Sequence, residues 1–210
     1  RNFRVTTNSL GVTRFQNMIK DIEVTGVNQV FVSDITYFDF GSDTRYLTFI
    51  MDLYNREIVG YSESDNLRTE STTLPALHRL IKERGRSNLK GAIIHSDGGG
   101  QYYCNEFKTL TKSLGMINSM TEEKVYENSH AERLNGIIKN NYLYPYGPTS
   151  VNSLRRLLDK AVYMYNTGKP HKALGKLTPK EFKDTIDNEN NSPSNLPLST
   201  VNHHHKKRDS

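Results

Sequence analysis

The chain has 210 residues, which is long enough for one sizeable hydrophobic core with short appendages. Its single cysteine, Cys104, excludes an internal disulfide and a cysteine-rich zinc module, and no apolar run approaches the roughly 20 residues that cross a bilayer. The formal net charge of +5 favours a polyanionic partner, although a solvated basic surface alone would account for it.

Three strand-like segments follow a polar lead-in. Residues 1–28 are weakly patterned and predict an N-terminal arm. The segments 29–38, 44–52 and 56–63 are rich in Val, Ile, Tyr and Phe and are separated by turn residues. Because the connections are short, we expect these strands to form an antiparallel meander.

Helices and strands alternate in the rest of the chain. Leucines at helical spacing predict a helix over 69–84, in which Pro75 fits only the first turn. The further expected elements are a strand at 91–96, a helix through Phe107, Leu110 and Leu114, a strand at 116–120, and helices over 127–141 and 150–166. This order predicts a mixed α/β sheet with helices on its faces.

The chain becomes rich in Asn, Ser and Pro after Lys183 and ends in three histidines and a basic run. Such a composition buries too little apolar surface to offset chain entropy, which predicts a disordered basic tail over 184–210. The tail could bind phosphate without specificity or simply be solvated. We therefore expect three parts: the arm 1–28, a catalytic core with a C-terminal helical extension over 29–183, and the tail.

Three acidic residues carry most of the chemical information. Asp34 and Asp97 each end an apolar, strand-like run, and Glu132 lies in a helical stretch. Any one of them alone could be an exposed surface acid, and the glycines after Asp97 could merely form a tight turn. Together they form an oxygen-ligand set suited to hard divalent cations, which drive in-line attack at phosphodiesters. The set predicts a metal-dependent enzyme that cuts and joins DNA.

The helix around Glu132 has a polar face. Asn128, Glu132, Asn135 and Lys139 recur at helical spacing and share one side. A neighbouring apolar stripe, expected to dock on the sheet, consists of Ala131, Leu134, Ile138 and Tyr142. The polar face can combine metal ligation with phosphate binding, although an ordinary solvated helix face would have the same spacing.

Several motifs resemble those of the DDE transposases of bacterial insertion sequences, of the OrfB type, which share the integrase catalytic core with retroviral integrases. The motifs are Val32-Ser33-Asp34-Ile35-Thr36-Tyr37, His95-Ser96-Asp97-Gly98-Gly99-Gly100-Gln101-Tyr102, and Glu127-Asn128-Ser129-His130-Ala131-Glu132-Arg133 with Lys139 following. Tyr165-Asn166, Pro170-His171-Lys172-Ala173-Leu174-Gly175 and Thr178-Pro179-Lys180-Glu181-Phe182 are similar to the family's C-terminal signature. The resemblance covers roughly residues 1–183.

The resemblance implies a ribonuclease H-like fold, with a five-stranded mixed sheet whose first three strands are antiparallel and which is flanked by helices. It also implies metal-dependent DNA 3′-end cleavage and strand transfer. In this family pattern Asp34 would bridge two Mg²⁺ ions, with Mn²⁺ as a substitute, while Asp97 and Glu132 would each hold one. The DNA-binding residues would be Asn128, Arg133, Asn135 and Lys139.

The chain departs from the family pattern in small ways. The segment between Asp97 and Glu132 is one residue shorter than usual, with the difference in the loop 121–126. Phe31 replaces a common tryptophan, and Gly99 stands where a polar DNA contact is frequent. His95 could support Asp97 or simply be a core residue.

The resemblance further implies partners and a location. We expect DNA (element ends and target), a homo-oligomer on DNA, a helix-turn-helix module from a preceding segment or another subunit, no membrane, and the nucleoid of the bacterial cytoplasm. Two alternatives remain: a ribonuclease H-like nuclease that does not join DNA, and a decayed remnant that binds DNA without cutting it.

Overall fold

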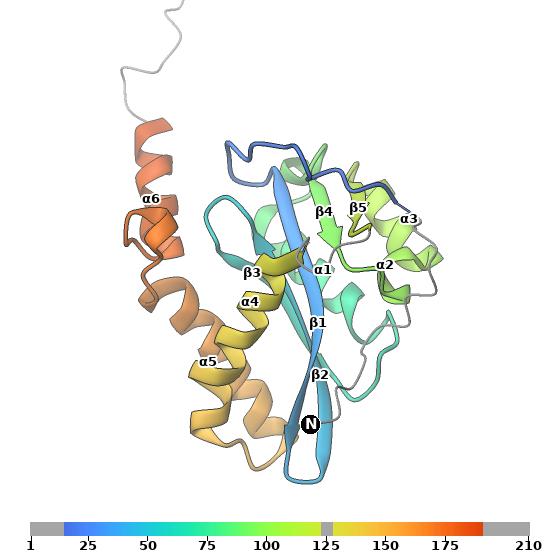
Figure 1. The fold of residues 1–210 in the computed structure, drawn as a ribbon, viewed down its shortest axis with the longest axis vertical. Coiled ribbons are helices and arrows are strands. Elements are labelled where there is room, and N and C mark those ends of the chain that lie inside the picture. Colours follow the sequence, from blue (N-terminus) through green and yellow to red (C-terminus); the bar gives the residue numbers. More distant parts are fainter. Residues whose placement is uncertain (1–14, 123–127, 191–210) are drawn as a thin grey trace, which may run out of the picture.

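The computed structural model describes residues 15–122 and 128–190 and contains a five-stranded sheet with the strand order β3-β2-β1-β4-β5 (Figure 1). The strands are β1 (Val30–Phe40), β2 (Asp43–Asp52), β3 (Ile58–Ser64), β4 (Ile93–Ser96) and β5 (Ile117–Met120). The first three pair antiparallel, and β4 pairs parallel to both β1 and β5. The predicted mixed sheet, with its antiparallel meander, is therefore confirmed.

Helices cover both faces of the sheet. They are α1 (Thr73–Arg84), α2 (Gly100–Tyr103), α3 (Asn105–Ser113), α4 (Ser129–Ile138), α5 (Val151–Gly168) and α6 (Pro179–Asn190). A π-helical turn, Lys139–Leu143, continues α4. Helix α1 starts at Thr73 rather than at residue 69, which places Pro75, its third residue, in the first turn, the only turn that it fits. No helix in the described ranges is long and apolar enough to cross a membrane.

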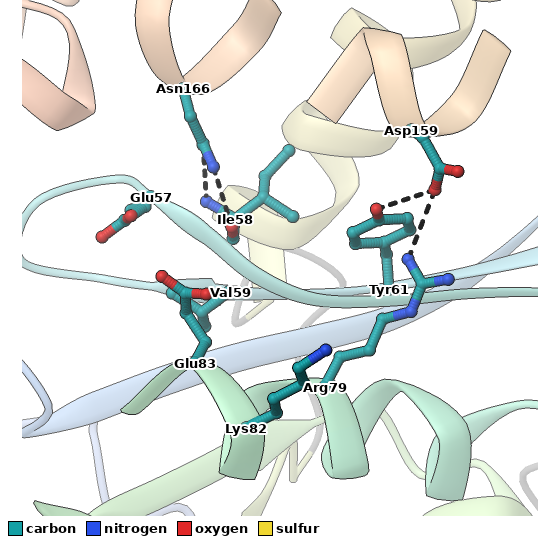
Figure 2. A pocket seen from close by; sticks show the side chains of 9 residues that line it. All are labelled: Glu57, Ile58, Val59, Tyr61, Arg79, Lys82, Glu83, Asp159 and Asn166. Carbon is teal, nitrogen blue, oxygen red and sulfur yellow. Dashed lines mark hydrogen bonds and ion pairs between the residues drawn. The ribbon is translucent and has the colours of Figure 1, made fainter. Parts of the chain in front are cut away.

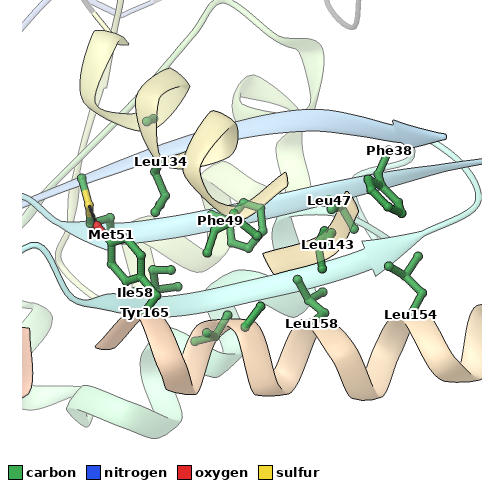
Figure 3. Close-up of a cluster of buried hydrophobic side chains, with 14 of the residues drawn as sticks. Phe38, Leu47, Phe49, Met51, Ile58, Leu134, Leu143, Leu154, Leu158 and Tyr165 are labelled. Carbon is green, nitrogen blue, oxygen red and sulfur yellow. Dashed lines mark hydrogen bonds between the residues drawn. The ribbon is translucent and has the colours of Figure 1, made fainter. Parts of the chain in front are cut away.

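Alternate residues of the strands point into two hydrophobic clusters, one on each side of the sheet. Val32 belongs to the cluster under α4 and α5, whereas its neighbour Phe31 belongs to the cluster under α1 and α3. Figure 3 shows side chains of the first cluster from the sheet (Phe38, Leu47, Phe49, Met51, Ile58) and from the helical side (Leu134, Leu143, Leu154, Leu158, Tyr165). Packing in the first cluster fixes the position of α4 over β1.

The edge strand β3 is partly covered by side chains. The Asn166 side chain accepts a hydrogen bond from the Ile58 backbone N–H and donates one to its carbonyl oxygen, both at 2.9 Å (Figure 2). Farther along the edge, the Arg79 guanidinium lies over the Tyr61 ring, 3.8 Å from its centroid. Asn166 therefore satisfies backbone groups that would otherwise be open to pairing with another strand.

One predicted boundary needs correction. The tail was expected to be disordered from residue 184, but α6 is helical through Asn190 and its Phe182 ring contacts Tyr54 at a centroid distance of 5.7 Å. Residues 191–210 lie outside the described part of the chain. The described end of the arm contacts β5, because the Met18 N–H donates to the Ser119 hydroxyl at 2.8 Å.

Candidate active site

Asp34 lies on β1, and Asp97 directly follows the neighbouring parallel strand β4. Ser33 of β1 is paired with Ser96 of β4, so the residues that follow them, Asp34 and Asp97, lie side by side where β4 ends. Parallel pairing brings the carboxyl ends of successive strands to one edge of the sheet, which is where ligands bind in such sheets. The tertiary structure thus brings together two acids that are far apart in the sequence.

The Asp34 carboxylate is held by hydrogen bonds and surrounded by like charge. Its Oδ1 accepts from the Ile35 N–H at 2.9 Å, and its Oδ2 accepts from the Asn135 side-chain amide at 2.7 Å. Burial raises the pKa of Asp34 well above its usual value, and the negative charges of Asp97 and Glu132 raise it further. All three acids are therefore close enough to interact electrostatically.

Glu132 lies in the first turn of α4 and is exposed. Within residues 15–122 and 128–190, no three His, Cys, Asp or Glu side chains are close enough to share one ion. The carboxylates consequently converge without forming a closed three-ligand cage. Since Glu132 is exposed, its side chain can change rotamer without disturbing the core. The shortened loop before α4 includes residues 123–127, which lie outside the described ranges.

The polar face of α4 turns toward β1 rather than toward solvent. The buried Asn128 side chain donates to the Ser33 carbonyl oxygen at 3.0 Å. The Lys139 ammonium donates to the Thr36 hydroxyl at 2.8 Å and to the Tyr37 carbonyl oxygen at 3.3 Å. Asn135 is buried against Asp34, so the alternative of an ordinary solvated helix face is wrong for this residue.

The apolar stripe of α4 docks on the sheet as predicted. Ala131, Leu134 and Ile138 are buried in the cluster that α4 shares with α5. Arg133 is exposed on another side of α4 and lines a pocket next to the segment that follows α5. Of the four predicted DNA-binding residues, three thus contact β1 and one lies apart.

Tyr102 was not singled out from the sequence, although it belongs to the motif that follows Asp97. It is fully buried behind the two aspartates, and its hydroxyl lies 2.9 Å from the Ser33 hydroxyl. Burial raises the pKa of Tyr102, and the charges of Asp97 and Asp34 raise it further. Tyr102 therefore stays protonated and keeps a polar hydrogen near the base of the site.

His95 is a core residue between β4 and β5. It is fully buried, and its Nδ1 lies 2.8 Å from the hydroxyl of Ser119 on β5. Asp97 instead accepts a hydrogen bond from the Gly99 N–H at 3.1 Å, which closes the turn after β4. Of the two roles considered for His95, these contacts favour the core role.

The fold is that of a polynucleotidyl transferase-type enzyme. Two overlapping family models, both described as integrase core domain, match residues 24–124 and 117–179. The chain belongs to this integrase core family and, within it, to the DDE transposases of the retroviral integrase superfamily. The predicted family is thereby confirmed.

Curated relatives come from insertion sequences. The chain is 29% identical to the uncharacterized 31 kDa protein of insertion element IS600 from Shigella sonnei. The aligned 191 residues cover 88% of this chain and 68% of the relative. It is 26% identical to the transposase of IS904 from Lactococcus lactis, over 80% of this chain and 66% of the relative. The chain thus spans about two thirds of the length of these proteins.

Solved structures confirm the ribonuclease H-like fold. The catalytic core domain of HTLV-2 integrase in complex with magnesium superposes with a TM-score of 0.59 at 21% identity, over 74% of this chain and 95% of that one. A chain of the simian T-cell lymphotropic virus intasome, solved in complex with PP2A regulatory subunit B56 gamma, gives a TM-score of 0.66 at 18% identity, over 97% of this chain and 67% of that one.

Proposed function

We propose that this chain is the catalytic core of a transposase that cleaves DNA at a 3′ end and joins that end to target DNA. The observation that carries the proposal is the placement of Asp34 and Asp97 on adjoining parallel strands, with Glu132 near enough to raise the pKa of Asp34. Names of relatives such as the IS904 transposase support the same activity.

Mg²⁺ fits this site, with Mn²⁺ as a substitute and two ions expected. The donors are carboxylate oxygens, which hard cations prefer, and a cation would relieve the repulsion that opposes ionisation of Asp34. The residues that would hold the ions are Asp34, Asp97 and Glu132, and the exposed Glu132 side chain is free to turn toward the aspartates. When bound, the metal supplies Lewis-acid stabilisation of phosphoryl oxygens and lowers the pKa of an attacking hydroxyl.

The surrounding residues position the acids and the DNA. Asn135 orients the Asp34 carboxylate, and Asn128 ties the start of α4 to β1, which keeps Glu132 beside the aspartates. Lys139 uses two of its three N–H donors on β1, so one remains for a DNA phosphate. Arg133 is exposed and suited to a second phosphate contact.

The partners follow from this activity. They are the DNA ends of a mobile element and its target, with a second copy of the chain on the DNA and a helix-turn-helix module from a preceding segment or another subunit. We place the protein at the nucleoid of the bacterial cytoplasm. An intasome among the structural neighbours supports assembly on DNA.

The reverse of DNA strand transfer can be measured with this chain alone and tests the proposed activity. A branched DNA that mimics the joined product should be resolved in Mg²⁺ or Mn²⁺, because the reverse reaction uses the same site. EDTA should abolish the reaction. Asp34→Asn, Asp97→Asn and Glu132→Gln should each reduce it about a hundredfold or more while the circular dichroism spectrum stays native.

Asp184→Asn is the matched control, because it removes the same charge from an exposed position on α6. It should react at the wild-type rate. Full activity in EDTA would refute the metal-dependent mechanism. Hydrolysis without any joining would identify a nuclease, and DNA binding without either reaction would identify a decayed remnant.

A further inference from the structure

A pocket of about 560 Å³ lies between α4, the β2–β3 turn and the segment that follows α5. Its lining includes the cationic side chains of Arg56, Arg133, Lys169 and Lys172, together with two histidines, His130 and His171. None of its lining residues is acidic. We call this the cationic pocket. The volume is in the range of sites that hold one small organic ligand.

Positive charge accumulates in the cationic pocket without a compensating anion on its walls. The Arg56 guanidinium lies 3.1 Å from Nδ1 of His130. Burial, together with the charges of Lys169, Arg56 and Arg133, lowers the pKa of His171 to about 4. A ligand carrying a negative group would relieve this mutual repulsion.

The pocket also has an apolar floor, which a bare phosphate would not use. Met51, Ile137 and Pro170 are among the side chains that form it. Hydrophobic ligands bury their surface on such groups, but a purely apolar ligand would leave the cations without a partner. The lining therefore suits a molecule that joins an anionic group to a flat apolar ring.

His171, one of the residues that line the pocket, carries an unpaired polar atom. Its Nε2 is buried and has no hydrogen-bond partner among the described residues. Because its pKa is near 4, the ring is neutral at pH 7 and Nε2 can donate or accept one bond, according to the tautomer. The backbone here is ordered, since the His171 N–H donates to the Leu177 carbonyl oxygen at 2.9 Å.

We propose that the cationic pocket holds one nucleotide of a DNA strand outside the duplex, with its phosphate on the cations, its base on the apolar floor and a base-edge atom on His171 Nε2. The proposal rests on the proposed function, because it assumes that the chain acts on DNA. Arg133 directly follows Glu132, and their α-carbons are about 3.8 Å apart. The cationic pocket and the acidic site are therefore served by successive residues on two sides of one helix, α4.

DNA probes with a fluorescent base or an abasic residue can detect this nucleotide without DNA cleavage or joining. The probe is a duplex with a short single-stranded extension, in which 2-aminopurine or an abasic residue replaces one nucleotide at a time. With the full chain in EDTA, 2-aminopurine emission should rise at one position, because the base leaves its stacked neighbours. An abasic residue at that position should weaken binding about tenfold.

Variants separate the base contact from the phosphate contact. His171→Ala should reduce the abasic penalty to less than about twofold and leave the salt dependence unchanged. Lys169→Ala combined with Lys172→Ala should weaken binding of every probe and flatten the slope of log K against log salt by about one to two units. Lys112→Ala removes one charge from an exposed position on α3 and should change neither quantity.

Two results would overturn the nucleotide site. One is a lack of any position with raised emission and an abasic penalty. The other is an abasic penalty that persists in two variants, His171→Ala and Ile137→Trp. The tryptophan of the second variant would fill the apolar floor, and circular dichroism must show that this variant has a native fold. If joining fails but this pattern holds, the proposed function falls and the nucleotide site stands. If joining occurs without the pattern, only the nucleotide site falls.

Discussion

Asp34 shows how one residue can be both well ordered and electrostatically unfavourable. Two hydrogen bonds hold its carboxylate, yet burial and two neighbouring acids oppose its ionisation. The Lys139 ammonium lowers the pKa of Asp34, but the raising effects are larger. A site that is strained in this way without metal gains stability when a cation binds.

This environment predicts a pH dependence of stability in the absence of metal. The unfolded-state pKa of an aspartate is about 3.9, and the folded-state pKa of Asp34 is well above it, so the folded protein binds more protons between the two values. The free energy of unfolding in EDTA should therefore fall as pH rises from about 4 through the folded pKa. Urea unfolding at a series of pH values measures this slope.

The matched comparison uses two aspartate variants. In Asp34→Asn the component of the slope that belongs to this carboxylate should disappear, whereas Asp184→Asn should keep it. Added Mg²⁺ should also remove the fall in stability at neutral pH, since the cation favours the ionised acids. Identical slopes in wild type and Asp34→Asn would contradict the account.

At the scale of elements, α4 and β1 form a joined unit. Three side chains contact β1 along its length: Asn128 directly before α4, Asn135 within it, and Lys139 directly after it. On its other side, α4 packs Ala131 and Leu134 into the core shared with α5. Because α4 is fixed on the sheet, the backbone of Glu132 has a defined position relative to β1, although its exposed side chain is not part of the core.

Lys139 tests this coupling because it has both a structural and a proposed DNA role. Lys139→Ala should lower the free energy of unfolding by about 1–2 kcal/mol, since two hydrogen bonds to β1 are lost. It should also flatten the slope of log K against log salt for DNA by about one unit. Chemical denaturation and salt titrations measure the two effects separately.

Lys160→Ala, at an exposed position on α5, is the control for loss of one charge. Its unfolding free energy should stay within about 0.5 kcal/mol of wild type. A Lys139→Ala protein with wild-type stability would show that the β1 contacts contribute nothing. An unchanged salt slope would restrict Lys139 to its structural role.

At the scale of the whole molecule, a buried ionic group links the helix layer under the sheet to the β2–β3 turn. Arg84 at the end of α1 pairs with Glu57 and lies 3.9 Å from Asp52, and all three side chains are buried. Burial raises the pKa of Asp52, while hydrogen bonds from the Asn28 and Tyr54 N–H groups lower it. The group adds a buried ionic contact between α1 and the β2–β3 turn.

Arg84→Met should lower the free energy of unfolding by about 3–5 kcal/mol, because it leaves buried carboxylates without their cation. Urea denaturation measures the loss. The double variant Arg84→Met, Glu57→Gln should recover part of it, since one uncompensated charge is removed. Arg86→Met, two residues farther on at an exposed position, should lie within about 0.5 kcal/mol of wild type.

Much of the fold could be predicted because its elements have strong local patterns. Successive side chains of each strand point to opposite apolar faces, and turn residues separate the strands. The existence and order of the strands therefore follow from this alternation and from the positions of the turn residues. The prediction of helix boundaries was weaker: α6 was not expected beyond residue 183, because its polar composition carries little periodic signal and its contact with Tyr54 is remote in sequence.

By itself, the sequence determined the order of the elements and the family and predicted the three acids as the candidate site, because each depends on residue types and spacing that are visible in the chain. Only the tertiary structure decided which way the polar face of α4 turns, that Tyr102 lies behind the aspartates, and that the segment after α5 meets Arg133. These features depend on contacts between residues far apart in the sequence. Helical spacing defines which residues share a face, whereas packing decides what that face touches.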